Sequence, residues 1–277
     1  MLEEYKGYSI VKCTDQELST FYQEGKLPIV REPRENEYFV VEDIEGNIVD
    51  KRCWEDGEFR HLRSRPIETY HLGVLRSKNL EQEFAFDMLQ NQSVDIKLLA
   101  GNYGSGKSLL MIAHALEALE KNRIDKIIFV RNNIELKDTT PLGSLPGTAT
   151  EKMLPWAGNI GDHLGSMDAV RTLIEKNELE IAPLGYLRGR DFRRSIIFCD
   201  EAENLTTHQC QLLIGRIGED SQLWFAGDRR QTDKTIFEKD SGMEKMVDRL
   251  SGKELFAYVY LPRSERSRAS AYADLLD

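Results

Sequence analysis

The chain has 277 residues, of which 40% are hydrophobic and 30% are charged, and its formal net charge at pH 7 is −10. This composition is typical of a globular protein and, with no repeat in the sequence, excludes disordered, collagen-like and coiled-coil classes. The acidic balance argues against a protein that coats nucleic acid by bulk electrostatic attraction, although it leaves room for a local basic groove.

The sequence predicts a cytoplasmic protein with no membrane partner. No run approaches the roughly 20 apolar residues that a membrane helix needs, and no apolar stretch follows the acidic start, so we expect no secretory signal. The four cysteines are far apart and form no CxxC pair, which speaks against a zinc site or a disulfide framework. Reduced thiols are typical of the cytosol.

Residues 1–70 are predicted to form a small β-rich appendage. Apolar runs at 38–41 and 48–49 flank Glu45-Gly46-Asn47, which predicts a hairpin, and a second turn at Asp56-Gly57 extends it to a meander. The segment has 10 Lys and Arg against 16 Asp and Glu, so it carries −6 of the net charge. We find no group of residues with evident chemistry in it.

From residue 71 onward, helices alternate with short apolar strands. A helix is predicted over about 107–121, where apolar residues recur on one face. Strands that are apolar throughout and separated by helices indicate a parallel sheet covered on both faces. The predicted strands are 96–100, 126–130, 195–199, 223–226 and 256–260. Residues 71–277 are therefore predicted to form an α/β core.

A phosphate-binding loop joins the first of these strands to the helix. Its sequence, GNYGSGKS, fits the GxxxxGK[ST] pattern in the strand–loop–helix context that the pattern requires. Glycines allow backbone N–H groups to converge on a β-phosphate, and the helix N-terminus adds donors and a favourable dipole. Lys107 would reach the β- and γ-phosphates, and the Ser108 hydroxyl would ligate Mg²⁺. The nucleotide-binding candidates are Gly101, Asn102, Tyr103, Gly104, Ser105, Gly106, Lys107 and Ser108.

The strand at 195–199 ends in two carboxylates, Asp200 and Glu201. In a nucleotide site, Asp200 would hold Mg²⁺ through its water shell, and Glu201 would orient and polarise the attacking water. Two solvated acids in a turn are the alternative interpretation. The phosphate loop about 90 residues earlier favours the nucleotide site, and Glu201 favours hydrolysis over simple binding.

Two more polar positions follow the last two strands. Gln231 ends the run Gly227–Gln231, where its amide would sense a γ-phosphate or the attacking water; the alternative is a polar turn at the sheet edge. After the last strand, an arginine in the segment 263–267 would stabilise transition-state charge as a finger, although most single arginines only face solvent.

In this order, the motifs resemble those of the PhoH-like ATPases, relatives of the superfamily 1 helicases with a single RecA-like core. The resemblance covers residues 70–277 and is most specific in LGSLPG at 142–147, RGR at 188–190 and DEAEN at 200–204. It is closest to the ATPase half of PhoH-like proteins with an N-terminal PIN nuclease domain. Residues 1–70 do not match such a nuclease, so we expect no nuclease activity, and Glu203 stands where the family usually has Gln.

The resemblance implies an α/β fold: a RecA-like P-loop NTPase core, with a mostly parallel sheet flanked by helices, beside the β-rich appendage. It implies Mg²⁺-dependent ATP hydrolysis coupled to RNA or single-stranded nucleic acid. Gln82, upstream of the phosphate loop, would face the adenine. The implied catalytic residues are Glu201, Lys107, Gln231 and Arg266, and the implied metal-binding residues are Ser108 and Asp200.

A single RecA-like core lacks the second core that completes the site in most helicases of this type. We therefore expect a homo-oligomer in which protomers associate head to tail, most simply a closed ring such as a hexamer. Arg266 of a neighbour would then complete each site; alternatively, it acts within its own chain.

The candidate nucleic-acid track is an arginine cluster with only Asp191 opposing it, together with the 142–147 loop and Lys152. The cluster consists of Arg188, Arg190, Arg193 and Arg194, and a structural role is the alternative for Arg188 and Arg190. A second functional hypothesis is a nucleotide-dependent switch or assembly ATPase that acts on a protein partner through the acidic appendage. A small-molecule kinase leaves Gln231 and Arg266 unexplained.

Overall fold

The computed structural model describes residues 5–131, 153–228 and 239–265. Its core is a six-stranded parallel sheet in the order β12-β7-β11-β10-β8-β9. The strands are β7 (Ile96–Gly101), β8 (Lys126–Arg131), β9 (Leu179–Pro183), β10 (Ser195–Cys199), β11 (Gln222–Gly227) and β12 (Phe256–Leu261). All five predicted strands are confirmed. The structure adds the edge strand β9, which the sequence pattern does not indicate because Glu180 and Pro183 interrupt its short apolar run.

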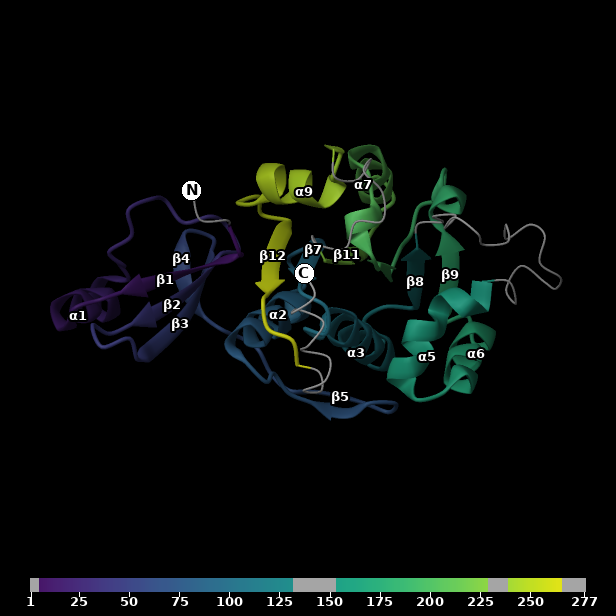
Figure 1. Ribbon diagram of the computed structural model, residues 1–277, viewed down its shortest axis with the longest axis horizontal. Helices are drawn as coiled ribbons and strands as arrows, with labels where there is room; N and C mark the ends of the chain where they lie inside the picture. The colour runs from purple at the N-terminus through teal and green to yellow at the C-terminus, as the bar shows by residue number, and fades with distance from the viewer. Residues whose placement is uncertain (1–4, 132–152, 229–238, 266–277) are drawn as a thin grey trace, which may run out of the picture.

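Helices cover both faces of this sheet, as an all-apolar strand pattern requires (Figure 1). Leu99 of β7 joins the apolar cluster under one set of helices, whereas Leu98 and Ala100 join the cluster under the other. The first set is α2 (Leu80–Gln90), α3 (Lys107–Glu120), α5 (Gly158–Leu164) and α6 (Met167–Glu175); the second is α7 (Thr207–Ile214) and α9 (Gly242–Leu250). The predicted RecA-like P-loop α/β architecture is confirmed. No helix in the described ranges combines the length and apolar character needed to cross a membrane.

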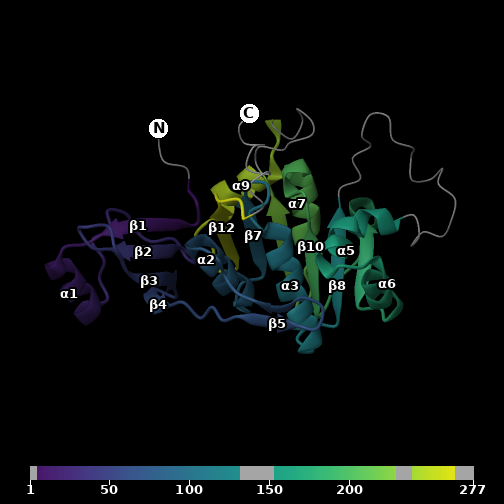
Figure 2. The ribbon, with the colours of Figure 1, turned by 60° about the horizontal axis from the view of Figure 1, so that its bottom comes forward.

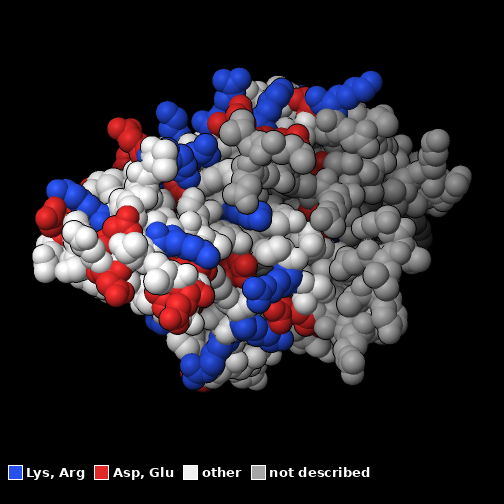
Figure 3. All heavy atoms as spheres, turned by 60° about the vertical axis from the view of Figure 1, so that its left-hand side comes forward, with Lys and Arg blue, Asp and Glu red and all other residues white. Residues whose placement is uncertain are grey.

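The N-terminal segment forms a four-stranded sheet beside the core (Figure 2). Its elements are β1 (Tyr8–Lys12), α1 (Asp15–Glu24), β2 (Tyr38–Glu42), β3 (Ile48–Glu55) and β4 (Glu58–His61). The predicted meander is present as β2, β3 and β4, while β1 pairs in parallel with β2 after a crossover through α1. Tyr38 stacks on Phe84 of α2 with ring centroids 4.7 Å apart, so this sheet packs against the core. Acidic and basic side chains are interspersed on the face in Figure 3.

A hairpin follows the appendage and packs on α3. It consists of β5 (Ile67–Thr69) and β6 (Gly73–Leu75), and Ile67 is fully buried in the main core. The predicted boundary after residue 70 lies in the turn of this hairpin and stays a prediction. After β6 the chain passes directly to Arg76 and Lys78, which line a pocket at the edge of the core sheet where its strands end.

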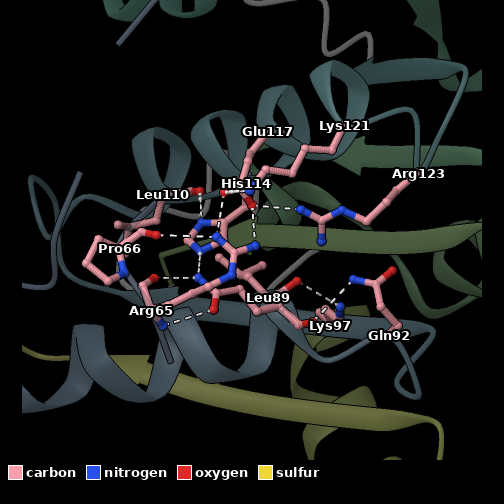
Figure 4. Close-up of polar contacts among 11 residues, drawn as sticks. Arg65, Pro66, Leu89, Gln92, Lys97, Leu110, His114, Glu117, Lys121 and Arg123 are labelled. Carbon is pink, nitrogen blue, oxygen red and sulfur yellow. Dashed lines mark hydrogen bonds and ion pairs between the residues drawn. The ribbon is translucent and has the colours of Figure 1, made fainter. Parts of the chain in front are cut away.

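A buried polar group, which we call the amino-edge cluster, lies where β7 and β11 begin; it consists of Lys97, His114 and Glu117 (Figure 4). The Lys97 ammonium donates to Leu89 O (3.2 Å), Asn91 O (2.7 Å) and Gln222 Oε1 (2.9 Å), and His114 Nδ1 lies 2.7 Å from Leu110 O. The Glu117 carboxylate accepts from Arg65 (2.6 and 2.9 Å), Lys121 (2.7 Å) and Arg123 (2.8 Å). Through the Arg65–Glu117 pair, the cluster ties the segment between the appendage and β5 to α3.

Burial and pairing shift the pKa values of all three residues in this cluster. Burial lowers the pKa of Lys97 to about 7 and that of His114 to about 4, because a charged form is poorly solvated there. Burial alone would raise the pKa of Glu117, but hydrogen bonds from Arg65, Lys121 and Arg123 outweigh it and lower the pKa to about 2.

Candidate functional site

A pocket of about 390 Å³ opens at the opposite edge of the sheet, where the carboxyl ends of the strands meet. Ligands of open α/β sheets bind at this edge because the loops that follow parallel strands converge there. The segments after β7, β10 and β11 line the pocket, together with Arg131 at the end of β8 and side chains from α2 and α5. The predicted phosphate loop and the predicted acidic pair are thus brought into one pocket.

The phosphate loop has the backbone that its glycines allow. Gly104 and Gly106 have φ of 73° and 93°, in the left-handed region, and Gly106 begins helix α3. A Cβ on Gly101 would lie 2.4 Å from Leu261 O, so the approach of β12 leaves room only for glycine. Lys107 Nζ donates to Gly101 O (2.7 Å) and Asn102 O (3.0 Å), and therefore lies across the loop at the base of the pocket.

Ser108 and Asp200 come together from α3 and the end of β10. Ser108 Oγ donates to Asp200 Oδ1 at 3.0 Å, and Asp200 is only 8% exposed. Burial raises the pKa of Asp200, opposed by the Ser108 hydrogen bond and by the charges of Arg131 and Lys107. Hydroxyl and carboxylate oxygens are donors that Mg²⁺ takes, together with nucleotide phosphates and waters. Within the described ranges, no group of three or more His, Cys, Asp or Glu is placed to hold a metal by itself.

Glu201 follows in an unusual backbone conformation. Its φ is 57° and its ψ 45°, a left-handed geometry that costs a non-glycine residue roughly 1 kcal/mol. It starts the 3-10 turn η4 (Ala202–Asn204), and its carboxylate forms an ion pair with Arg131 at the end of β8. The Glu201 side chain is 40% exposed, so it lies at the mouth of the pocket, whereas Asp200 lies inside it.

Glu203 is a buried carboxyl in the pocket wall. Its Oε2 accepts the Asp228 N–H at 2.9 Å, which links the segments after β10 and β11. Burial raises the pKa of Glu203 to about 7, against the opposing effect of backbone N–H groups. The buried Glu203 carboxyl therefore titrates near neutral pH.

Gln82 lies where α2 meets the phosphate loop. Its Oε1 accepts the Lys78 N–H (3.0 Å) and its Nε2 donates to Ser105 O (3.1 Å), while Asn79 caps the helix. The side chain lines the pocket, so it is placed beside the loop; its contact with adenine stays a prediction. Glu265 N–H donates to Gly104 O at 2.9 Å, which brings the segment after β12 to the same loop.

The pocket is also lined by Asn159 and His163 of α5, two residues that the sequence patterns do not indicate. Asn159 Nδ2 donates to Asp200 Oδ2 at 2.5 Å. Their i, i+4 spacing puts both on one helix face, but the sequence carried no sign of which strand end that face would meet. Gln231 and Arg266 lie outside the described residues, as do the 142–147 loop and Lys152.

Three of the four arginines in the predicted nucleic-acid cluster are paired with carboxylates. Arg190 forms a two-bonded pair with Glu180 (2.5 and 3.0 Å), and Arg194 forms one with Asp125 (2.9 and 3.1 Å). Arg193 donates to Asp191 at 3.1 Å. Arg188 is exposed, and it has no hydrogen bond or ion pair with any described residue. It occupies a turn closed by Arg190 N–H to Leu187 O (3.2 Å), in which Gly189 has a φ of 76°.

Comparison with known proteins identifies a family. The model of the PhoH-like protein family matches residues 74–277. Protein PhoH2 of Mycolicibacterium smegmatis is 34% identical over 71% of this chain and 46% of its own length. Protein PhoH2 of Thermobispora bispora is 33% identical over the same shares, and protein PhoH2 of Bacillus subtilis is 29% identical over 99% of this chain and 65% of its own length. The chain thus spans about half to two thirds of these relatives.

Among solved structures, the Pif1 helicase from Candida albicans matches 73% of this chain and 44% of that chain. The TM-score is 0.37 and the sequence identity is 14%.

Proposed function

Because this chain belongs to the PhoH-like protein family, we propose that it hydrolyses ATP with Mg²⁺ at the carboxyl edge of its sheet and couples hydrolysis to binding or remodelling RNA or single-stranded nucleic acid. The observation that carries the proposal is the Ser108–Asp200 hydrogen bond of 3.0 Å. It joins the phosphate loop to the acidic strand end, which are 92 residues apart in sequence. A chance glycine-rich turn would have no reason to meet that carboxylate.

The chain's residues would divide the hydrolysis among them. Backbone N–H groups of the phosphate loop and Lys107 bind the β- and γ-phosphates, and Ser108 and Asp200 hold Mg²⁺, which neutralises charge on those oxygens. Glu201 orients a water toward the γ-phosphorus and accepts its proton as the new P–O bond forms. The bond from the γ-phosphorus to the bridging oxygen breaks, and ADP and inorganic phosphate leave. The ion pair with Arg131 holds the Glu201 carboxylate at the mouth of the pocket.

The remaining predicted residues would couple this chemistry to movement. Gln82 would read the adenine, Gln231 would sense the γ-phosphate, and Arg266 would supply the finger, from the same chain or from a neighbour in a homo-oligomeric ring. The four buried, free cysteines suit a reducing compartment, so we place the protein in the cytoplasm.

Because the other arginines of the cluster form ion pairs with carboxylates, Arg188 is the candidate for contact with a nucleic-acid phosphate. Arg190 and Arg194 already neutralise Glu180 and Asp125, whereas Arg188 is exposed at a turn that Leu187 anchors in the core. The chain continues from this turn into β10, whose end carries Asp200 and Glu201. A phosphate bound at Arg188 would therefore lie on the segment that leads to the catalytic carboxylates.

The test is phosphate release from ATP with and without single-stranded RNA, for the wild type, Glu201→Gln and the control Glu219→Gln, an exposed carboxylate at the other edge of the sheet. We expect stimulation by RNA in the wild type and the control, and loss of hydrolysis with Glu201→Gln. Hydrolysis that responds to no polymer would instead favour a nucleotide-dependent switch acting on a protein partner. Hydrolysis that survives Glu201→Gln would contradict the site.

A further inference from the structure

The side chain of Asn159 is only half satisfied, and its satisfied half is bound to a proposed metal-binding residue. Ser108 and Asn159 each donate to one oxygen of the Asp200 carboxylate, at 3.0 and 2.5 Å. The other end of the amide, Asn159 Oδ1, is buried and has no hydrogen-bond partner among the described residues. The chain thus buries a strong acceptor inside the pocket without supplying a donor.

The orientation of this amide follows from chemistry. An ionised carboxylate only accepts hydrogen bonds, so the NH₂ end of Asn159 must face Asp200 and the carbonyl end must face away. Turning the amide round would put two oxygens against each other. A buried carbonyl next to a ligand pocket is satisfied when the bound ligand brings a donor.

The ligand chemistry beside Asp200 provides such a donor. Mg²⁺ keeps several waters when it is bound through one or two protein oxygens and phosphates. These waters are donors because the cation occupies their lone pair, and each has two hydrogens that need acceptors. Asp200 can accept one of them, and Asn159 Oδ1 is a second acceptor carried on the side chain that holds Asp200.

We propose that Asn159 is a positioning residue for the metal: its Nδ2 fixes the Asp200 carboxylate, and its Oδ1 accepts a hydrogen bond from a water of the Mg²⁺ hydration shell. This inference rests on the proposed function, because it requires nucleotide and Mg²⁺ in the pocket. It adds α5 to the elements that build the site. His163, one turn later on the same helix, lines the same pocket.

The test measures metal binding without turnover. Mn²⁺ replaces Mg²⁺, ADP replaces ATP, and the electron paramagnetic resonance signal of free Mn²⁺ gives the affinity of the protein–ADP complex. For Asn159→Ala we expect an affinity about 10- to 100-fold weaker than that of the wild type, as for the loss of other partners behind metal ligands, with ADP affinity in the absence of metal unchanged. The matched control is Asn47→Ala, which removes an Asn–Asp hydrogen bond of 2.8 Å in the appendage and should bind Mn²⁺ like the wild type.

A double variant separates the water contact from the support of Asp200. Asp200→Asn removes the carboxylate that Asn159 holds. A residue that acts only through that carboxylate would have no further effect in this background, whereas we expect Asn159→Ala to weaken Mn²⁺ binding further. No further loss in the double variant would overturn the inference, as would wild-type affinity in Asn159→Ala alone. If the wild-type complex binds Mn²⁺ no more tightly than ADP alone, the proposed function itself fails.

Discussion

Lys97 and Lys107 lie at opposite ends of β7, and both donate hydrogen bonds to main-chain carbonyls. Lys97, at the start of the strand, is fully buried and meets two carbonyls and the Gln222 side chain. Lys107, beyond the end of the strand, meets two carbonyls of the phosphate loop at the base of an open pocket. The first lysine is enclosed by the protein, whereas the second faces space that a phosphate can enter.

The surroundings of the two lysines differ in the same way. At the carboxyl edge, Asn159 Oδ1 and Arg131 Nε, from residues that line the pocket, and Ser105 Oγ of the phosphate loop are buried without partners among the described residues. At the amino edge, Lys97 is hydrogen-bonded to Gln222, and Glu117 is paired with Arg65 and Lys121. Yet the hollow at the amino edge is the larger, about 590 Å³ against 390 Å³. Unsatisfied groups on the residues that line a hollow, rather than its volume, therefore distinguish the ligand site.

The largest expected effect separates the two lysines by activity. Lys107→Ala should lower kcat/KM for ATP at least about 100-fold, because it removes the positive charge that stabilises the transferred phosphate. Lys97→Met should leave kcat/KM within about twofold of the wild type, since Lys97 lies at the other edge of the sheet. Steady-state phosphate release measures both. Comparable losses in the two variants would remove the distinction between the edges.

The next effect is on stability. Glu117→Ala leaves Arg65, Lys121 and Arg123 without their shared carboxylate, so we expect the free energy of unfolding to fall by about 2–3 kcal/mol with turnover unchanged. Urea denaturation measures the change. Asp168→Ala, which breaks an exposed pair with Arg171, serves as the control and should stay close to the wild type. A wild-type midpoint in Glu117→Ala would show that the amino-edge cluster does not stabilise the fold.

The third effect is a pH dependence of stability. The pKa of Lys97 is about 7 in the folded protein and near 10.5 in the unfolded chain, so the unfolded chain binds the extra proton between these values. The free energy of unfolding should therefore rise as pH increases from 7 toward 10.5, and fall as pH decreases through that window. The difference between the wild type and Lys97→Met, followed by urea denaturation at pH 7 and pH 9.5, isolates this contribution. A difference that does not change with pH would contradict the buried state of Lys97.

The smallest effect extends the comparison to the arginines. Arg188→Gln should weaken binding of a labelled single-stranded RNA about fivefold and reduce its salt dependence by about one phosphate contact. Arg193→Gln is the matched control, because Arg193 is already paired with Asp191. Fluorescence anisotropy across a salt series measures both variants. Equal weakening of RNA binding in the two variants would mean that ion pairing with a carboxylate does not decide which arginine contacts RNA.

Features that depend on residues close together in the sequence could be predicted. The phosphate loop, helix α3 and the five core strands follow from local patterns, and so does the meeting of Asp200 with the loop, because parallel strands share one edge. Short edge elements were harder. Strand β9 and the β1–α1 crossover have weak patterns, and their pairing is decided by tertiary packing.

Polar partners that come from distant segments could not be predicted. The sequence places only Asp191 beside the arginine cluster, whereas folding brings Glu180 and Asp125 to Arg190 and Arg194. Asn159 meets Asp200 across 41 residues, and nothing in its own segment indicates that contact. Lys97 lies within a predicted apolar strand, and its burial depends on acceptors from α2 and β11.

Hydrogen exchange of backbone amides, with and without Mg²⁺ and a non-hydrolysable ATP analogue, tests the distinction between the two edges most directly. We expect slower exchange on nucleotide binding at residues 101–108 and 200–204, and unchanged exchange at 89–97 and 114–123. Slower exchange at the amino edge, with the phosphate loop unaffected, would contradict this distinction.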